Sequence, residues 1–307
     1  GESNVRNSVS IGGGVFKTTD GGESWKLMGL DKVERIAKIA LNPKNPEIAY
    51  IAGLGALWGP SSERGLYKTV DGGKTFQKIL YVDENTGCAE VVLDPENPDI
   101  VYASMWQHRR EAWNFSSGGP NSGFYKSIDA GKTWTKLVND VPKGDLGRII
   151  IAVAPSKPNI VYAMIESDES GLYRSENRGD SWTKVSSAVS VTARPFYFSC
   201  LYVDAVNENR IYRPSFQLGI SEDGGKTFNG FSYGGGAHAD HHALWIDPEN
   251  PQHLLLGTDG GVYRSYDRGA TWTQFRNLPL AQFYRISHDE DEPYNVFGGL
   301  QDNGSWM

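Results

Sequence analysis

Three of the six histidines of this chain fall within five residues, in the segment HADHH at residues 238–242. If the segment is extended, His238, Asp240 and His242 share one face and His241 takes the other, because side chains alternate along a strand. Imidazole and carboxylate groups bind divalent metals, and they also transfer protons. Three roles stay open: a metal site of His238, Asp240 and His242, an acid–base or polar ligand site, and a hydrogen-bonded structural plug.

A second polar segment, GLQDNGSW, lies near the end of the sequence and contains Gln301 and Asp302. Glycoside hydrolysis normally needs two carboxylates that flank one bond, roughly 5 to 10 Å apart. We expect Asp240 and Asp302 to come from neighbouring parts of the fold and to face each other. Together with His241 they are the predicted catalytic residues, and the other acidic residues on the same set of loops are Asp259, Glu63 and Glu111.

Aromatic and arginine residues are concentrated in other loops. Trp58, Trp106 and Trp113 could offer flat faces for sugar stacking, and Arg109 could bind an acidic group; alternatively the tryptophans pack the loops and the arginine is solvated. Arg148 and Tyr197 are expected near a central opening. The predicted ligand-binding residues are Trp58, Trp106, Arg109, Trp113, Arg148, Tyr197, His238, His242 and Gln301.

The elements that must position these residues are repeated. The phrase Ser/Thr-x-Asp-x-Gly-x-Thr/Ser-Trp/Phe occurs six times, with anchors 44 to 58 residues apart at Thr18, Thr69, Ser127, Ser175, Ser221 and Ser265. Asp at a turn accepts backbone N–H bonds, and the Gly that follows adopts a positive φ readily. A catalytic group is needed once, so six copies indicate a structural element. Asn177, which replaces Asp in the fourth copy, fits this interpretation.

A second phrase with Asn-Pro turns alternates with the first. In RIIIAVAPSKPNIVYAMI, residues 148–165, two β-branched runs flank a Pro-containing turn, which predicts a hairpin. Each repeat then reads as four strands, and a unit this short needs neighbours to bury its apolar faces. The predicted fold is all-β, a β-propeller of four-stranded antiparallel blades.

The predicted propeller is a single domain over residues 1–307. The blades are expected at 30–80, 81–139, 140–186, 187–231 and 232–275, with two strands in 1–29 and two in 276–307. Joining the two end segments would make a mixed sixth blade; otherwise the chain is part of a larger propeller and a fragment of a longer protein. The Asn-Pro and Asp turns should share one rim, so function is expected on the opposite rim, whose loops vary.

The repeated phrase resembles the Asp-box, or BNR repeat. With the Asn-Pro turns, HADHHALWIDP and GLQDNGSW, the chain is most similar to bacterial secreted glycosyl hydrolase-like, sortilin N-terminal-like and xyloglucanase-like propellers. The resemblance implies a secreted, periplasmic or cell-surface protein that binds, and in one version hydrolyses, glycans on the rim opposite the Asp-boxes. The alternative that it implies is a non-catalytic protein-interaction or assembly scaffold. The Arg-Ile-Pro stretch typical of sialidases is missing.

Composition restricts the partners. The net charge is −7, the pI is about 5.4, and there is no basic tract, so we expect no nucleic-acid partner. No apolar run reaches the roughly 18 residues of a membrane span. Two cysteines, Cys88 and Cys200, are too few for a disulfide framework. The expected partner is a polysaccharide, another glycan or a protein, and no cofactor is predicted beyond the open alternative of a divalent metal.

Overall fold

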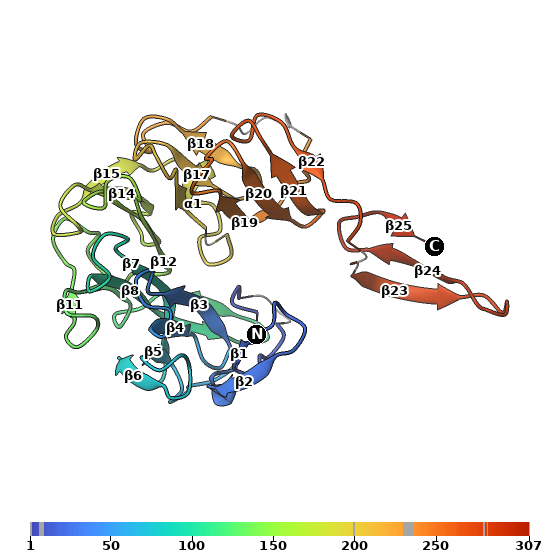
Figure 1. Ribbon diagram of the computed structural model, residues 1–307, viewed down its shortest axis with the longest axis horizontal. Coiled ribbons are helices and arrows are strands. Elements are labelled where there is room, and N and C mark those ends of the chain that lie inside the picture. Colours follow the sequence, from blue (N-terminus) through green and yellow to red (C-terminus); the bar gives the residue numbers. More distant parts are fainter. Residues whose placement is uncertain are drawn as a thin grey trace. The chain divides into compact units, whose positions relative to one another are not determined.

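The computed structural model describes residues 2–5, 9–198, 200–229, 236–278, 280 and 282–306. It consists of small antiparallel sheets that form five blades of a propeller (Figure 1). Two compact units are distinguished, residues 1–213 with 220–228 and residues 214–219 with 229–307, and each is described by itself. Among the described residues, no helix is long and apolar enough to cross a membrane.

The blades follow the chain in order. Blade 1 contains β3 (Ile36–Leu41), β4 (Ala49–Gly53), β5 (Gly65–Thr69) and β6 (Gln77–Leu80), and blade 2 contains β7 (Thr86–Leu93), β8 (Val101–Arg110), β9 (Phe115–Ser117), β10 (Gly123–Ser127) and β11 (Thr135–Lys136). Blade 3 contains β12 (Ile149–Val153), β13 (Val161–Ile165), β14 (Gly171–Ser175) and β15 (Thr183–Ser186). Blade 4 contains β16 (Tyr202–Val203), β17 (Ile211–Arg213) and β18 (Gly219–Ser221), and blade 5 contains β19 (His241–Ile246), β20 (Leu254–Thr258), β21 (Gly261–Ser265) and β22 (Thr273–Gln274).

The remaining elements are short. They are β1 (Val15–Lys17), β2 (Lys26–Gly29), the 3₁₀ turn η1 (Asp31–Val33), the helix α1 (Val189–Thr192), and the strands β23 (Phe283–His288), β24 (Val296–Leu300) and β25 (Ser305–Trp306). The fourth strand expected in blade 4 should follow Phe228; residues 230–235 there lie outside the described residues.

The prediction of six blades is wrong, because the described residues form five. The expected mixed blade is not formed: β1 pairs with β2 in one sheet, and β23, β24 and β25 form another. The physical reason is a tight turn after Leu300, where Asp302 and Gly304 have positive φ and the Leu300 N–H donates to the Gly304 carbonyl at 2.8 Å. Asn-Gly sequences favour such hairpins, so β24 takes its partner from the residues that follow it.

The longest predicted loop is also largely a hairpin. β8 continues through Trp106 and His108 to Arg110 and pairs with the additional strand β9, so blade 2 has five strands. The hairpin closes between Glu111 and Asn114, whose backbone groups bond to each other. Along β8, therefore, Trp106 and His108 face one side of the hairpin and Gln107 and Arg109 the other.

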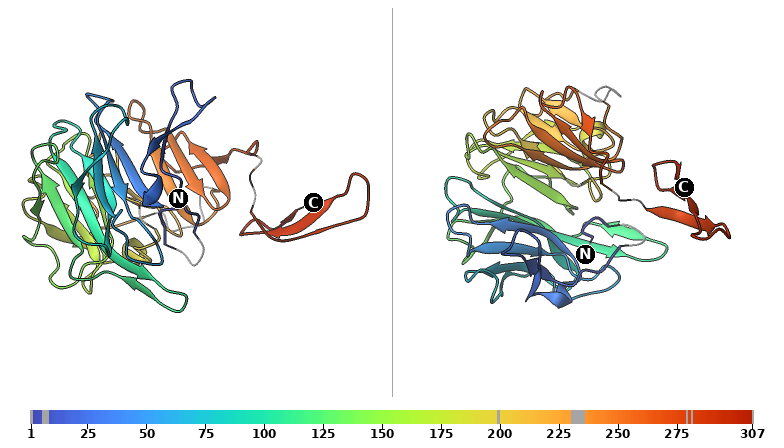
Figure 2. Two further views of the ribbon diagram at one scale, coloured as in Figure 1. Left: turned by 90° about the horizontal axis from the view of Figure 1, so that it is seen from below. Right: turned by 45° about the vertical axis from the view of Figure 1, so that its right-hand side comes forward.

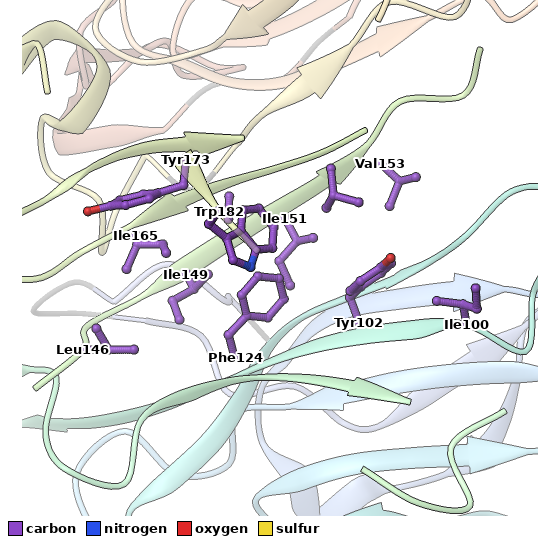
Figure 3. Packing of buried hydrophobic residues seen from close by; sticks show 12 residues of the cluster. Ile100, Tyr102, Phe124, Leu146, Ile149, Ile151, Val153, Ile165, Tyr173 and Trp182 are labelled. Atoms are coloured by element: carbon purple, nitrogen blue, oxygen red, sulfur yellow. The ribbon is translucent and has the colours of Figure 1, made fainter. Parts of the chain in front are cut away.

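The hydrophobic core lies between neighbouring blades. In the first unit, Tyr102 and Phe124 of blade 2 pack against Ile149, Ile151 and Trp182 of blade 3, as the close view in Figure 3 shows. The rings of Phe124 and Trp182 are 5.2 Å apart between centroids. Similar clusters join blades 1 and 2 and blades 3 and 4, so each of these sheets is covered on a face by the next (Figure 2). This confirms the inference that a repeat cannot bury its faces alone.

The repeated Asp turns are structural. In the third turn the Ser127 hydroxyl donates to Asp129 at 2.8 Å, and Asp129 accepts from the Thr133 backbone N–H at 2.9 Å and from the Thr133 hydroxyl at 2.6 Å. The Ala130 N–H donates to the Asp99 carbonyl, which follows the Asn-Pro turn of the same blade. The Asn-Pro and Asp turns of a blade thus share one rim, as predicted.

These hydrogen bonds, the Thr133 hydroxyl first, lower the pKa of Asp129 from 3.8 to about 2. The ionised form is therefore favoured by folding. The stabilisation is fully present above pH 3.8 and is lost as the pH falls toward 2.

We predict that Asp129→Ala lowers the melting temperature by on the order of a few degrees, whereas Asp129→Asn lowers it less. Asn keeps one acceptor oxygen, and Asn177 accepts from the Ser175 hydroxyl at 2.8 Å and from the Ser181 N–H at 3.0 Å in its own turn. Thermal unfolding followed by circular dichroism measures both changes. Equal losses in the two variants would show that the acceptor oxygen is not what stabilises the turn.

Candidate functional site

The segment HADHH and the turn QDNG meet in the second unit. His241 begins β19, Asp259 lies in the turn between β20 and β21, and Asp302 lies in the turn between β24 and β25. The Asp259 N–H donates to the Asp240 carbonyl at 3.1 Å, and the side-chain amide of Asn303 donates to the Asp259 carbonyl at 2.9 Å. Three separate turns therefore bring their polar residues together.

Asp259 is the centre of this group. Its carboxylate lies 3.0 Å from Nε2 of His242, and the carboxyl of Asp302 is within hydrogen-bonding reach. Burial raises the pKa of Asp259 above its ordinary value of 3.8, His242 opposes the rise, and Asp302 and Asp240 add to it. A neighbouring carboxyl disfavours ionisation, so Asp259 holds its proton more tightly than an isolated Asp.

His238 is held by backbone carbonyls on both sides of its ring. Nδ1 lies 3.1 Å from the carbonyl oxygen of Ala239, and Nε2 lies 3.0 Å from that of Asp302. A neutral imidazole donates from one ring nitrogen only, and the predicted metal site of His238, Asp240 and His242 stays a prediction. No group of three His, Cys, Asp or Glu side chains that could hold a metal occurs in the described ranges.

His241 is buried while His238 and His242 are half-exposed, although the segment before His241 is not an extended strand. Its Nε2 donates to the His238 carbonyl at 2.8 Å, and burial lowers the pKa of the imidazole. His241 thus fixes the backbone of the segment. Asp240 and Asp302 both have positive φ, near 59° and 58°, and both lie outside the strands. The backbone N–H of Gln301 donates a hydrogen bond to the Gln282 carbonyl at 2.9 Å.

Two of the predicted ligand-binding residues are buried in the first unit. Trp106 is fully buried, its ring stacks on that of His108 at 4.3 Å, and Nε1 donates to the Ser117 hydroxyl. A sugar cannot stack on it, so the packing alternative describes Trp106. The guanidinium of Arg148 lies 5.2 Å from the centre of the Trp106 ring and donates to the Phe196 carbonyl at 2.7 Å. Arg148 therefore anchors a loop.

A pocket of about 480 Å³ lies beside the hairpin of β8 and β9, lined by Asn85, Gln107, His108, Arg109, Glu111, Ser116 and Gly118. Arg109 donates to the side chain of Asn85 at 2.7 Å.

Trp113, at the hairpin end, is 85% exposed, and Trp58 is 53% exposed. Tyr197 is half-buried with the Arg194 guanidinium 4.8 Å from its ring centre. The pocket and the two exposed tryptophans are therefore open to a ligand.

Sequence reasoning missed two features. Asp259 was one acidic residue among several, although its position in the Thr-Asp-Gly-Gly turn between two strands of blade 5 was a usable signal. The buried group of Arg35, Arg64 and His108 was not foreseen at all, because these residues come from three segments of two blades.

We predict that stability falls as the pH rises through the raised pKa of Asp259, because the folded state holds this proton more tightly than the unfolded chain. Asp259→Asn should remove that fall, since an amide does not titrate. Melting temperatures of both proteins, measured from pH 3.8 upward, test this. Parallel profiles would contradict the raised pKa of Asp259.

The sequence matches no family model and no curated protein. The fold resembles that of an ancestral GH74 enzyme, with a TM-score of 0.66 at 18% identity over 99% of this chain and 43% of the enzyme, so this chain spans less than half of that protein. It also resembles YCF48 bound to D1 peptide, with 0.57 at 18% identity over 97% and 86% of the chains. A gluconolactonase from Xanthomonas campestris gives 0.50 at 10% identity over 78% and 74%. These likenesses show the fold, an all-β propeller.

Proposed function

We propose that this chain is a glycan-binding propeller whose ligand contacts the His–Asp cluster, defined as His238, Asp240, His242, Asp259 and Asp302. The observation that carries the proposal is the contact of Asp259 with both His242 and Asp302. A carboxyl pair beside an imidazole offers acceptors and donors at one place, which suits the hydroxyl groups of a sugar. The fold supports the proposal because a GH74 enzyme shares it.

Binding is favoured over hydrolysis by the spacing of the carboxyls. Retaining and inverting glycosidases hold their two carboxyls roughly 5 to 9.5 Å apart, to leave room for the bond or for a water molecule. Asp259 and Asp302 are in hydrogen-bonding contact, which is too close for either mechanism. The predicted catalytic roles of Asp240, Asp302 and His241 remain proposals, and the cluster is assigned here to recognition.

Two further parts of the proposal come from the resemblance of the sequence. The six repeated turns, five with Asp and one with Asn177, are proposed to be Asp-boxes, and their hydrogen bonds support this. We also propose that the protein is secreted, periplasmic or at the cell surface, as the resemblance to Asp-box proteins implies.

The second candidate function is a non-catalytic protein-interaction scaffold. It is favoured by the sheet of β23, β24 and β25, where every residue of β23 is exposed. Phe283, Tyr284 and Ile286 are 40%, 70% and 67% exposed, which is unusual for a strand with apolar residues on both faces. A solved propeller of this fold, YCF48, is bound to a peptide.

We predict that the intact protein binds at least one member of a panel of neutral and acidic polysaccharides, and that Asp302→Asn weakens this binding by on the order of tenfold or more. The expected cause is the loss of a charged acceptor from an exposed turn. Affinity electrophoresis or calorimetry measures the binding, and the melting temperature of the variant should stay close to that of the original.

The matched control is Glu290→Gln, which removes one carboxylate from an exposed loop of the same sheet. It should leave binding unchanged. Absence of binding to every polysaccharide would overturn the glycan proposal and favour the protein scaffold, whereas equal weakening by the two variants would move the site away from the cluster.

A further inference from the structure

Two arginines and a histidine are buried together in the first unit. Arg35 precedes β3, Arg64 precedes β5, and His108 lies on β8; their side chains are 1%, 0% and 1% exposed. Nη2 of Arg35 lies 3.1 Å from Nε2 of His108, and Nη1 of Arg64 lies 3.2 Å from Nδ1 and 3.4 Å from Nε2 of the same ring. Both guanidiniums thus face one imidazole.

The imidazole is neutral. Burial, together with the charges of Arg64 and Arg35, holds the pKa of His108 well below 6.5. Nδ1 lies 3.3 Å from the carbonyl oxygen of Trp106, which fits a proton on Nδ1 and leaves Nε2 as the acceptor for Arg35. His108 therefore supplies a lone pair and no negative charge.

The two positive charges have no carboxylate partner. Among the described residues, no carboxylate oxygen lies within 4.0 Å of either guanidinium, and Glu34 and Asp83 act on their pKa values only at longer range. Each side chain donates to backbone carbonyls instead, Arg35 to Gly55 at 2.9 Å and Arg64 to Ala56 at 2.8 Å. Burial lowers the pKa of each arginine from 12.5 to about 10.

Both guanidiniums also keep an unused donor. Nη1 of Arg35 and Nε of Arg64 are buried, and no described protein atom accepts from them. Val5, Leu54 and Leu57 pack around Trp106 beside the group and exclude water from that side. Buried charges that lack a counter-charge are expensive, and in such surroundings an anion would interact strongly with them.

We propose that Arg35 and Arg64, beside His108, form a binding site for one small inorganic anion, which accepts hydrogen bonds from the unused guanidinium donors. The site is independent of the glycan proposal, because it lies in the other unit and uses none of the residues of the His–Asp cluster. The anion neutralises part of the buried charge and fixes the loops that Arg35 and Arg64 hold through Gly55, Ala56 and Gly59.

The test is thermal unfolding of the intact chain in the sodium salt of a bulky sulfonate buffer. The buffer anion is replaced stepwise, at constant ionic strength, by chloride in one series and by inorganic phosphate in another. We expect the melting temperature to rise with the concentration of at least one of them, as for a ligand that binds only the folded state. A rise with chloride alone identifies a halide site, and a rise with phosphate identifies an oxyanion site.

The variant Arg64→Met should abolish this rise. The matched control is Arg213→Met, because Arg213 is equally buried and also donates to backbone carbonyls, those of Val191 and Cys200, but lies outside the group. The control should retain the rise, which separates specific binding from the general effect of phosphate on protein surfaces.

If Arg64→Met does not fold, Arg35→Lys provides the second variant. It keeps the charge and removes the guanidinium donors, so the apparent affinity should fall by about tenfold or more. No rise with either anion in the original protein, or the same rise in the Arg213 variant and in either test variant, would overturn the proposal.

Discussion

The sheets of blades 2 and 3 each have two apolar faces, and neither face can be buried within the sheet itself. The clusters around Tyr102, Phe124 and Trp182 show the solution, since these residues fill the space between two neighbouring sheets. Polar bonds cross the same boundaries: the hydroxyls of Tyr50 and Tyr102 donate to carbonyls of the following blade, at Ala130 and Arg178. The fold therefore depends on stacking of blades, and a single repeat would not be stable.

The stereotyped turns let the remaining loops vary. In each repeated turn a carboxylate or an amide oxygen accepts hydrogen bonds from backbone N–H groups of the same turn. These bonds lower the pKa values of Asp129 and Asp267, so both carboxyls are ionised far below neutral pH. In the described part of the opposite rim, the loops do not repeat such a network. They are held by individual side chains such as Arg148, which donates to the Phe196 carbonyl. Different loops could thus acquire different chemistry on one scaffold.

The two units concentrate charge in opposite ways. The His–Asp cluster of the second unit brings three carboxyls and two imidazoles together at a half-exposed surface, where protons can be exchanged. The group of Arg35, Arg64 and His108 in the first unit is closed to solvent and carries excess positive charge, although the whole chain has a net charge of −7. The proposed ligand of the His–Asp cluster is therefore a polar hydroxyl compound, and the proposed ligand of the arginine group is an anion.

The sequence by itself determined the local elements. Alternating apolar residues, Asn-Pro turns and the phrase around Asp129 or Asp267 predict strands and turns, because these preferences act over a few residues. They also pointed to His238, Asp240 and Asp302. Only the tertiary structure decided that Asp259 joins them, that Trp106 is buried, and that Arg35 and Arg64 share His108. Burial and pairing depend on contacts between segments far apart in the chain, and no local preference specifies those contacts.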